Sequence, residues 1–159
     1  MMNYTKEKTD AYKKYAEVFT PAGTVFEMIL YEGVRDCVRD VDATILDPAV
    51  GQGQFPCAEL VCKMFYNIDR LTPELALRAV QSLYVIDIQT NNVKTTQNHL
   101  LATLLDSYEF FTGKLLPVDI QFAAHDAVNN NFIVGDSLKI MEEWTKPQQS
   151  LFDEVFYHE

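Results

Sequence analysis

One stretch of the sequence constrains the fold more than any other, and it reads Ile45-Leu46-Asp47-Pro48-Ala49-Val50-Gly51-Gln52-Gly53-Gln54-Phe55. An apolar run that ends in an acidic residue, followed by two glycines and an apolar-periodic segment, predicts a buried strand, a turn and a helix. Glycine has no side chain to hold a ligand away from the backbone, and the first N–H groups of a helix lack partners within it. The stretch therefore predicts a nucleotide-type cofactor site, although the third glycine of the dinucleotide fingerprint is not filled.

The rest of the chain alternates in the same way. Further strands are expected at Leu83–Asp87, at Phe132–Asp136 and near 152–157, after a first strand at Thr44–Leu46. Helices are expected at 4–18, from Thr20-Pro21 to about Arg39, at Phe55–Tyr66, from Thr72-Pro73 to Val80, from Thr90 to Asp106 and from Ser137 to about Trp144. Residues 107–130 read as irregular, either an insertion or a short helix with a loop. Strands that alternate with helices predict an α/β fold with a parallel, doubly wound sheet.

Three of the expected strands end in an acidic residue: Asp47, Asp87 and Asp136. The carboxyl ends of parallel strands share one edge of the sheet, and ligands of open α/β sheets bind at that edge. A carboxylate there can accept hydrogen bonds from hydroxyl or amino groups. Each Asp taken alone is better explained as a cap of a turn or helix, but the three together with the glycine turn favour a ligand site.

Composition narrows the class of protein. The chain has 159 residues and a formal net charge of −10, which fits one domain and opposes direct grip on a nucleic-acid backbone. The lysines near the N-terminus, Lys6, Lys8, Lys13 and Lys14, are best explained as a solvated helix face. Three cysteines without nearby histidine partners support neither a zinc site nor a disulfide framework. With no leader and no membrane-spanning run, we expect a cytoplasmic protein without metal or membrane association.

Four segments together resemble a known family. They are Phe19-Thr20-Pro21, Asp47 to Phe55, Tyr84-Val85-Ile86-Asp87-Ile88 and Asn131-Phe132-Ile133-Val134-Gly135-Asp136-Ser137. Their order is similar to that in adenine-N6 DNA methyltransferases, in the group whose Phe-Thr-Pro segment precedes the glycine motif. The resemblance covers the chain from about Tyr15 to Asp153 and implies a Rossmann-like, S-adenosylmethionine-dependent methyltransferase fold. We expect residues 1–40 to form an N-terminal helical segment and 41–159 the cofactor-binding domain, as one compact unit.

The resemblance also implies roles for individual residues. Thr20 and the backbone near Pro21 would contact the methionine end of S-adenosylmethionine, although a simple helix cap explains Thr20 equally well. The amino group and cofactor backbone would be held by Asp47-Pro48-Ala49 and the turn from Gly51 to Gly53, with Phe55 near the target base. Asp87 would take the ribose hydroxyls and Ile88 the adenine face. Asp136, followed by Ser137, would accept from the adenine amino group.

The resemblance stops before the family's catalytic tetrapeptide, which is Asn or Asp followed by Pro-Pro and an aromatic residue. No such string occurs here, and the sequence ends Tyr157-His158-Glu159. We therefore expect the cofactor half of a methyltransferase without catalytic or target-recognition elements, and a partner or self-association that completes the sheet. The alternatives are a non-catalytic binding module that acts through a protein partner, or an unrelated nucleotide binder that shares only the glycine turn.

Overall fold

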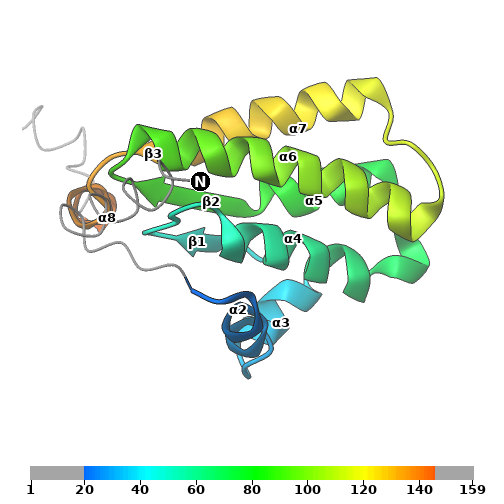
Figure 1. Cartoon of the computed structure of the whole chain (residues 1–159), viewed down its shortest axis with the longest axis horizontal. Coiled ribbons are helices and arrows are strands. Elements are labelled where there is room, and N and C mark those ends of the chain that lie inside the picture. Colours follow the sequence, from blue (N-terminus) through cyan, green and yellow to red (C-terminus); the bar gives the residue numbers. More distant parts are fainter. Residues whose placement is uncertain (1–19, 146–159) are drawn as a thin grey trace, which may run out of the picture.

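The structure is a computed structural model, and it describes residues 20–145 (Figure 1). This part of the chain contains seven α-helices, one short 3-10 helix and a three-stranded sheet. The strands are β1 (Ile45–Asp47), β2 (Leu83–Asp87) and β3 (Phe132–Val134), and both pairings are parallel in the order β1-β2-β3. The chain is therefore an α/β protein with a parallel sheet, as the alternation of apolar runs and helical segments predicts.

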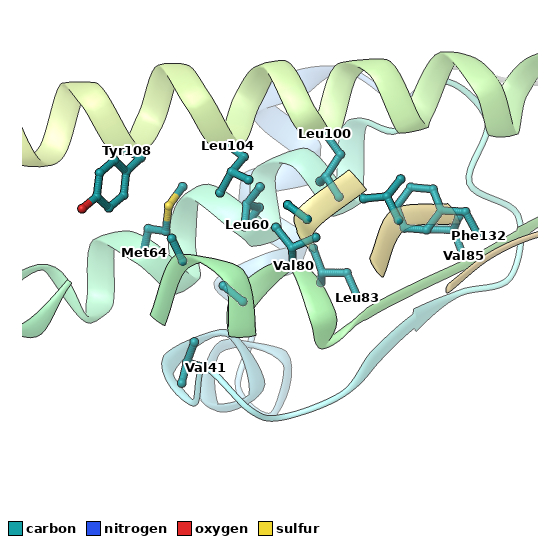
Figure 2. Close-up of a cluster of buried hydrophobic side chains, with 14 of the residues drawn as sticks. Val41, Leu60, Met64, Val80, Leu83, Val85, Leu100, Leu104, Tyr108 and Phe132 are labelled. Carbon is teal, nitrogen blue, oxygen red and sulfur yellow. The ribbon is translucent and has the colours of Figure 1, made fainter. Parts of the chain in front are cut away.

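The helices between the strands gather on one face of this sheet. α4 (Gln54–Tyr66), the 3-10 helix Ile68–Arg70 and α5 (Pro73–Gln81) connect β1 to β2, whereas α6 (Thr90–Thr112) and α7 (Val118–Asn131) connect β2 to β3. Right-handed crossovers that advance in one direction place their helices on the same face. Leu83 and Val85, which alternate onto one face of β2, accordingly join residues of all four α-helices in one buried apolar cluster (Figure 2).

The strand order advances without a reversal in the part of the chain that is described. A doubly wound sheet has such a reversal, and ligands bind beside it. The described residues are compatible with one half of a Rossmann-like fold. The expected helix at 4–18 and strand near 152–157 lie outside the described residues.

A smaller apolar cluster attaches the first helices to α4. α2 (Ala22–Ile29) and α3 (Val34–Arg39) contribute Val25, Ile29 and Val38, which pack against Ala58 and Cys62 of α4. Burying a side chain such as Val or Ile contributes roughly 2 kcal/mol, so three such side chains hold these short helices in place.

The sequence predicts one helix from Thr20-Pro21 to Arg39, and this is wrong in its middle. The helix breaks at 30–33, where Gly33 has φ +94°, a value that a helix cannot contain. The break changes which side chains face inward, and Met28 and Val34 are 52% and 41% exposed. Pro21, and not Thr20, is the N-cap residue of α2, and no side chain caps that end.

The prediction that residues 107–130 are irregular is also wrong, because most of them are helical. α6 continues to Thr112, where Gly113 at φ +67° ends it, and α7 fills most of the rest. Packing explains the difference, because Ala124 and Val128 of α7 are buried in the main cluster and Ile120 and Ala127 pack against it. The expected cap at Thr72 is confirmed, since its hydroxyl accepts from the N–H of Leu75 at 3.2 Å.

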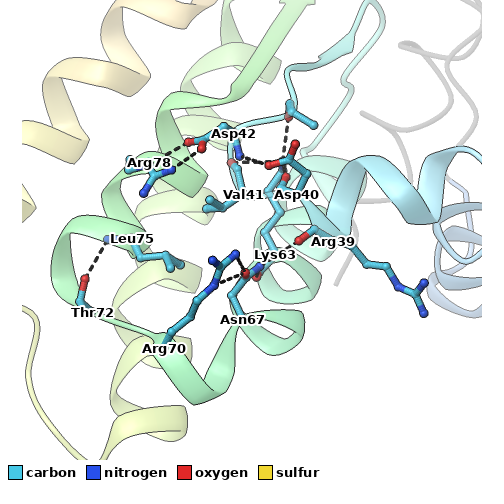
Figure 3. A network of polar contacts seen from close by, with 11 residues as sticks. Arg39, Asp40, Val41, Asp42, Lys63, Asn67, Arg70, Thr72, Leu75 and Arg78 are labelled. Atoms are coloured by element: carbon cyan, nitrogen blue, oxygen red, sulfur yellow. Dashed lines mark hydrogen bonds and ion pairs between the residues drawn. The ribbon is translucent and has the colours of Figure 1, made fainter.

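A buried lysine fixes the loop before β1 to α4 (Figure 3). Lys63 has no exposed surface, and its Nζ lies 2.8 Å from the carbonyl oxygens of Asp40 and Ala43, with those of Cys37 and Val41 at 3.3 and 3.4 Å. These carbonyls follow the end of α3, where a helix leaves its last acceptors unpaired and favours a cation. Burial lowers the pKa of Lys63, and the nearby carboxylates of Asp40 and Glu59 oppose this effect.

We expect Lys63→Met to destabilise the protein by about 2–4 kcal/mol, because it leaves buried carbonyl oxygens without a donor. Urea unfolding followed by circular dichroism measures the change. Lys94→Met is the matched control, because Lys94 is exposed on α6 and should change stability by no more than about 0.5 kcal/mol. Equal losses in the two variants would show that the carbonyl contacts of Lys63 contribute nothing.

Candidate functional site

A cavity of about 560 Å³ opens at the carboxyl ends of the three strands. All of the site residues predicted from sequence line it except Pro21 and Gly53; they are Thr20, Asp47, Pro48, Ala49, Gly51, Phe55, Asp87, Ile88, Asp136 and Ser137. The structure thus brings together residues that lie up to 117 positions apart, from Thr20 to Ser137 (137 − 20 = 117). The sequence argument that parallel strands deliver their acidic ends to one edge agrees with this geometry.

Asp87 is the most constrained group in the cavity wall. It is 7% exposed, and its Oδ2 accepts from the N–H of Gly51 at 2.9 Å while its Oδ1 accepts from the N–H of Gln89 at 2.8 Å. Nδ2 of Asn92 donates to the same carboxylate at 3.2–3.3 Å. The carboxylate therefore ties the glycine turn after β1 to the end of β2 and to the first turn of α6.

The glycine turn is closed by its own hydrogen bonds. The N–H of Ala49 donates to Asp47 Oδ1 at 3.0 Å, that of Val50 to Ile86 O at 3.3 Å and that of Gly53 to Val50 O at 3.1 Å. With Gly51 N–H held by Asp87, these amides are used inside the protein. The sequence argument expects turn amides that are open to a ligand, and at these positions the structure differs.

Gly53 is a glycine for a packing reason. It has φ +85°, and a Cβ there would lie 2.7 Å from Cγ2 of Thr96, a buried residue of α6. Two further contacts hold the turn on this helix: Thr96 Oγ1 donates to Gly51 O at 3.2 Å, and the ring Nδ1 of His99 lies 3.0 Å from Gln52 O. Gly53 is not on the cavity wall. The lack of a side chain at Gly53 therefore allows α6, and not a ligand, to approach the turn closely.

Asp136 caps α8 (Ser137–Thr145) and keeps one oxygen toward the cavity side. Its Oδ1 accepts from the N–H groups of Leu138 and Lys139 at 3.1 and 3.4 Å. Asp136, and not the following Ser137, is therefore the residue that caps this helix. The other oxygen lies 4.0 Å from Nζ of Lys139, too far for a hydrogen bond.

Two further carboxylates raise the negative potential behind the turn. Burial raises the pKa of Asp47, the N–H of Ala49 opposes that shift, and the charge of Asp87 adds to it. Glu59 of α4 is only 6% exposed, and burial together with the charge of Asp47 raises its pKa from 4.5 to about 7, with Lys63 acting in the opposite direction. Any cation near Asp47 would relieve this repulsion.

Sequence reasoning missed the residues of α6 that hold the glycine turn in place. Asn92, Thr96 and His99 follow a spacing of four and three residues, which places three polar side chains on one side of α6. Polar residues at this helical spacing, beside the apolar positions Val93, Leu100 and Leu104, are the signal that could have found them; Asn92 and Thr96 are buried, whereas His99 is exposed. Lining residues outside the prediction are Val50, Gln52, Gln54, Gln89, Asn92, Gly135 and Leu138.

Comparison with known proteins adds no family assignment: no family model, curated protein or solved structure matches the chain. Among residues 20–145 there is no helix whose length and apolar character would let it cross a membrane, and no group of three or more His, Cys, Asp or Glu that could hold a metal ion. All three cysteines are free, and burial raises the thiol pKa of Cys57 and Cys62.

The raised pKa of Glu59 predicts a pH-dependent stability. Folding favours the protonated form of Glu59. Its contribution to the free energy of unfolding is therefore fully present below pH 4.5 and is lost as the pH rises through about 7. Glu59→Gln keeps a neutral side chain, and we expect it to exceed the wild type in stability by roughly 3 kcal/mol at most above neutral pH, and by little in mild acid.

Urea unfolding at a series of pH values measures this difference. Glu109→Gln is the control, because Glu109 is exposed on α6 and its replacement should leave the pH profile of the wild type unchanged. A constant difference between Glu59→Gln and the wild type at all pH values would contradict the assignment.

Proposed function

We propose that the cavity binds S-adenosylmethionine and that the chain is the cofactor-binding part of an adenine-N6 DNA methyltransferase. The observation that carries this proposal is the charge of the cavity wall: Asp47, Asp87 and Asp136 line it, and within residues 20–145 no Lys, Arg or His is among its lining residues. Such a wall attracts a cationic ligand. S-adenosylmethionine has two positive groups, a sulfonium and an ammonium, and only one carboxylate, so its net charge is positive. It also carries ribose hydroxyls and an adenine amino group.

The same wall disfavours nucleotides that carry phosphates. Phosphate sites use open backbone amides or basic side chains, whereas here the turn amides of Ala49, Val50, Gly51 and Gly53 are already hydrogen-bonded. The volume of about 560 Å³ is within the range of cofactor pockets. These features support S-adenosylmethionine over a dinucleotide or nucleoside triphosphate.

The residues have distinct parts in this proposal. Asp47, half-buried and beside Glu59, faces the ammonium group, and Asp136 offers Oδ2, the oxygen that is ion-paired with Lys139 at 4.0 Å, to the adenine amino group. Ile88, which is 58% exposed, provides an apolar surface for the adenine ring. Asp87 holds the turn in place, and a ribose hydroxyl must share or replace one of its present hydrogen bonds.

Bound S-adenosylmethionine supplies an activated methyl group to an amine held in line with it. The protein's contribution is to position the donor, which Asp87 and Asn92 achieve by fixing the turn. A non-catalytic module is the second candidate, and the absence of an Asn/Asp-Pro-Pro-aromatic string together with the net charge of −10 favours it for the chain acting alone.

Titration calorimetry with S-adenosylmethionine tests the cofactor. We expect S-adenosylmethionine to bind to the wild type. Ala49→Phe places a large side chain in the wall of the cavity and should weaken this binding by at least roughly tenfold. Ala102→Phe is the matched control on the exposed side of α6 and should bind like the wild type. ATP should give no heat. A folded wild type that binds no S-adenosylmethionine, or binds ATP as well, would contradict the proposal.

Labelled S-adenosylmethionine with adenine-containing DNA separates the two candidates. We expect no methyl transfer by the chain alone, because it lacks the residues that would receive the target amine. Methylated adenine formed by the pure chain, and lost in Ala49→Phe but not in Ala102→Phe, would show that it is a complete enzyme.

A further inference from the structure

An apolar groove of about 310 Å³ lies between α6 and α7, beyond the end of α6 that lines the cofactor cavity. Leu101 and Leu105 form the α6 wall, and Val118, Phe122 and His125 form the α7 wall. The residues from α7 are spaced by four and three positions, so they present one side of that helix. Among the residues that the structure describes, none lines both the groove and the cofactor cavity.

The apolar walls of the groove are open to water. Phe122 is 69% exposed, Val118 63% and Leu105 38%, and Leu115 in the connection between the helices is 76% exposed. Scattered apolar residues are ordinary on a protein surface, but Leu105, Val118 and Phe122 converge on one concavity. Burying such side chains contributes roughly 2 kcal/mol each, which is enough for a specific contact.

Polar contacts close one end of the groove. Gln97 of α6 donates to Asn129 of α7 at 3.3 Å, and Nδ2 of Asn129 donates to Nδ1 of His125 at 3.1 Å. The part of the groove that stays open therefore runs from His125 toward the connection between the helices at Leu115. This shape is suited to about two turns of a helix, whose apolar side chains recur every three or four residues.

Acidic residues border this length. Asp119 is adjacent to Val118, and Asp126 follows Phe122 by four positions on α7; Glu109 follows Leu105 by four positions on α6. All three are exposed. Between residues 95 and 138, Lys114 is the only Lys or Arg. A second copy of this chain would bring the same acidic border and be repelled, whereas a basic segment would be attracted.

We propose that this groove binds an amphipathic helix of a partner protein, whose apolar face is flanked by basic residues. The apolar side chains of the helix enter between Leu105 and Phe122, and its Lys or Arg residues meet Glu109, Asp119 and Asp126. The proposal does not depend on the identity of the cofactor.

Two synthetic helical peptides test it. Both carry leucines at positions i, i+3, i+4 and i+7, and one has lysines on the flanks where the other has glutamates. Fluorescence anisotropy with the full chain should show binding of the lysine peptide only, and its affinity should fall as salt is added.

Matched variants locate the site. Phe122→Asp should weaken binding of the lysine peptide by at least roughly tenfold, whereas Phe110→Asp should not, because Phe110 is 83% exposed on α6 and does not line the groove. The double variant Asp119→Asn/Asp126→Asn changes only exposed side chains, so it tests the charge contribution without threatening the fold. It should weaken binding and reduce its dependence on salt.

Five outcomes would overturn the proposal. Four of them are binding of neither peptide, equal binding of both, equal losses in Phe122→Asp and Phe110→Asp, and, as the last of these four, a sedimenting dimer that Phe122→Asp dissociates. The last result would assign the groove to a second copy. Binding that requires removal of residues 1–19 would instead assign it to the chain's own N-terminal segment.

Discussion

The carboxylate of Asp87 is the interaction on which the rest of the site depends. It stands at the end of the central strand and accepts hydrogen bonds from groups that belong to the turn after β1, to the residues after β2 and to α6. A hydrogen bond to a charged acceptor contributes roughly 2 kcal/mol, and several that converge on one group act together. The glycine turn, the end of β2 and the first turn of α6 are thus joined at one point, and this point lies in the wall of the cavity.

Sequence reasoning reached the parts of the fold that local chemistry determines. The bounds of β2, Leu83–Asp87, were predictable to the residue, because a continuous apolar run ends in a single acidic side chain. The convergence of Asp47, Asp87 and Asp136 followed from the geometry of parallel strands alone. The α4 helix was equally accessible, since its apolar residues recur with helical spacing.

The parts that sequence reasoning missed depend on distant partners. Lys63 sits in an apolar helix, and only the carbonyls of the loop at 40–43 explain why a cation is buried there. Gly53 looks like a ligand contact until the side chain of Thr96 is placed against it. Polar residues at 107–130 suggested a loop, but Ala124 and Val128 supply enough buried surface to hold α7. Each error has the same origin, namely a contact between segments that are far apart along the chain.

Among the described elements, α6 is the one that lines both the cavity and the groove. It is continuous from Thr90 to Thr112, so it is a rod roughly 34 Å long. Its first turns hold the glycine turn through Asn92 and Thr96, and its later turns form a wall of the groove through Leu101 and Leu105. A rod cannot tilt at one end alone. An occupant of the cavity that shifts this helix would therefore change affinity at the groove by some factor, and an occupant of the groove would then change affinity at the cavity by the same factor.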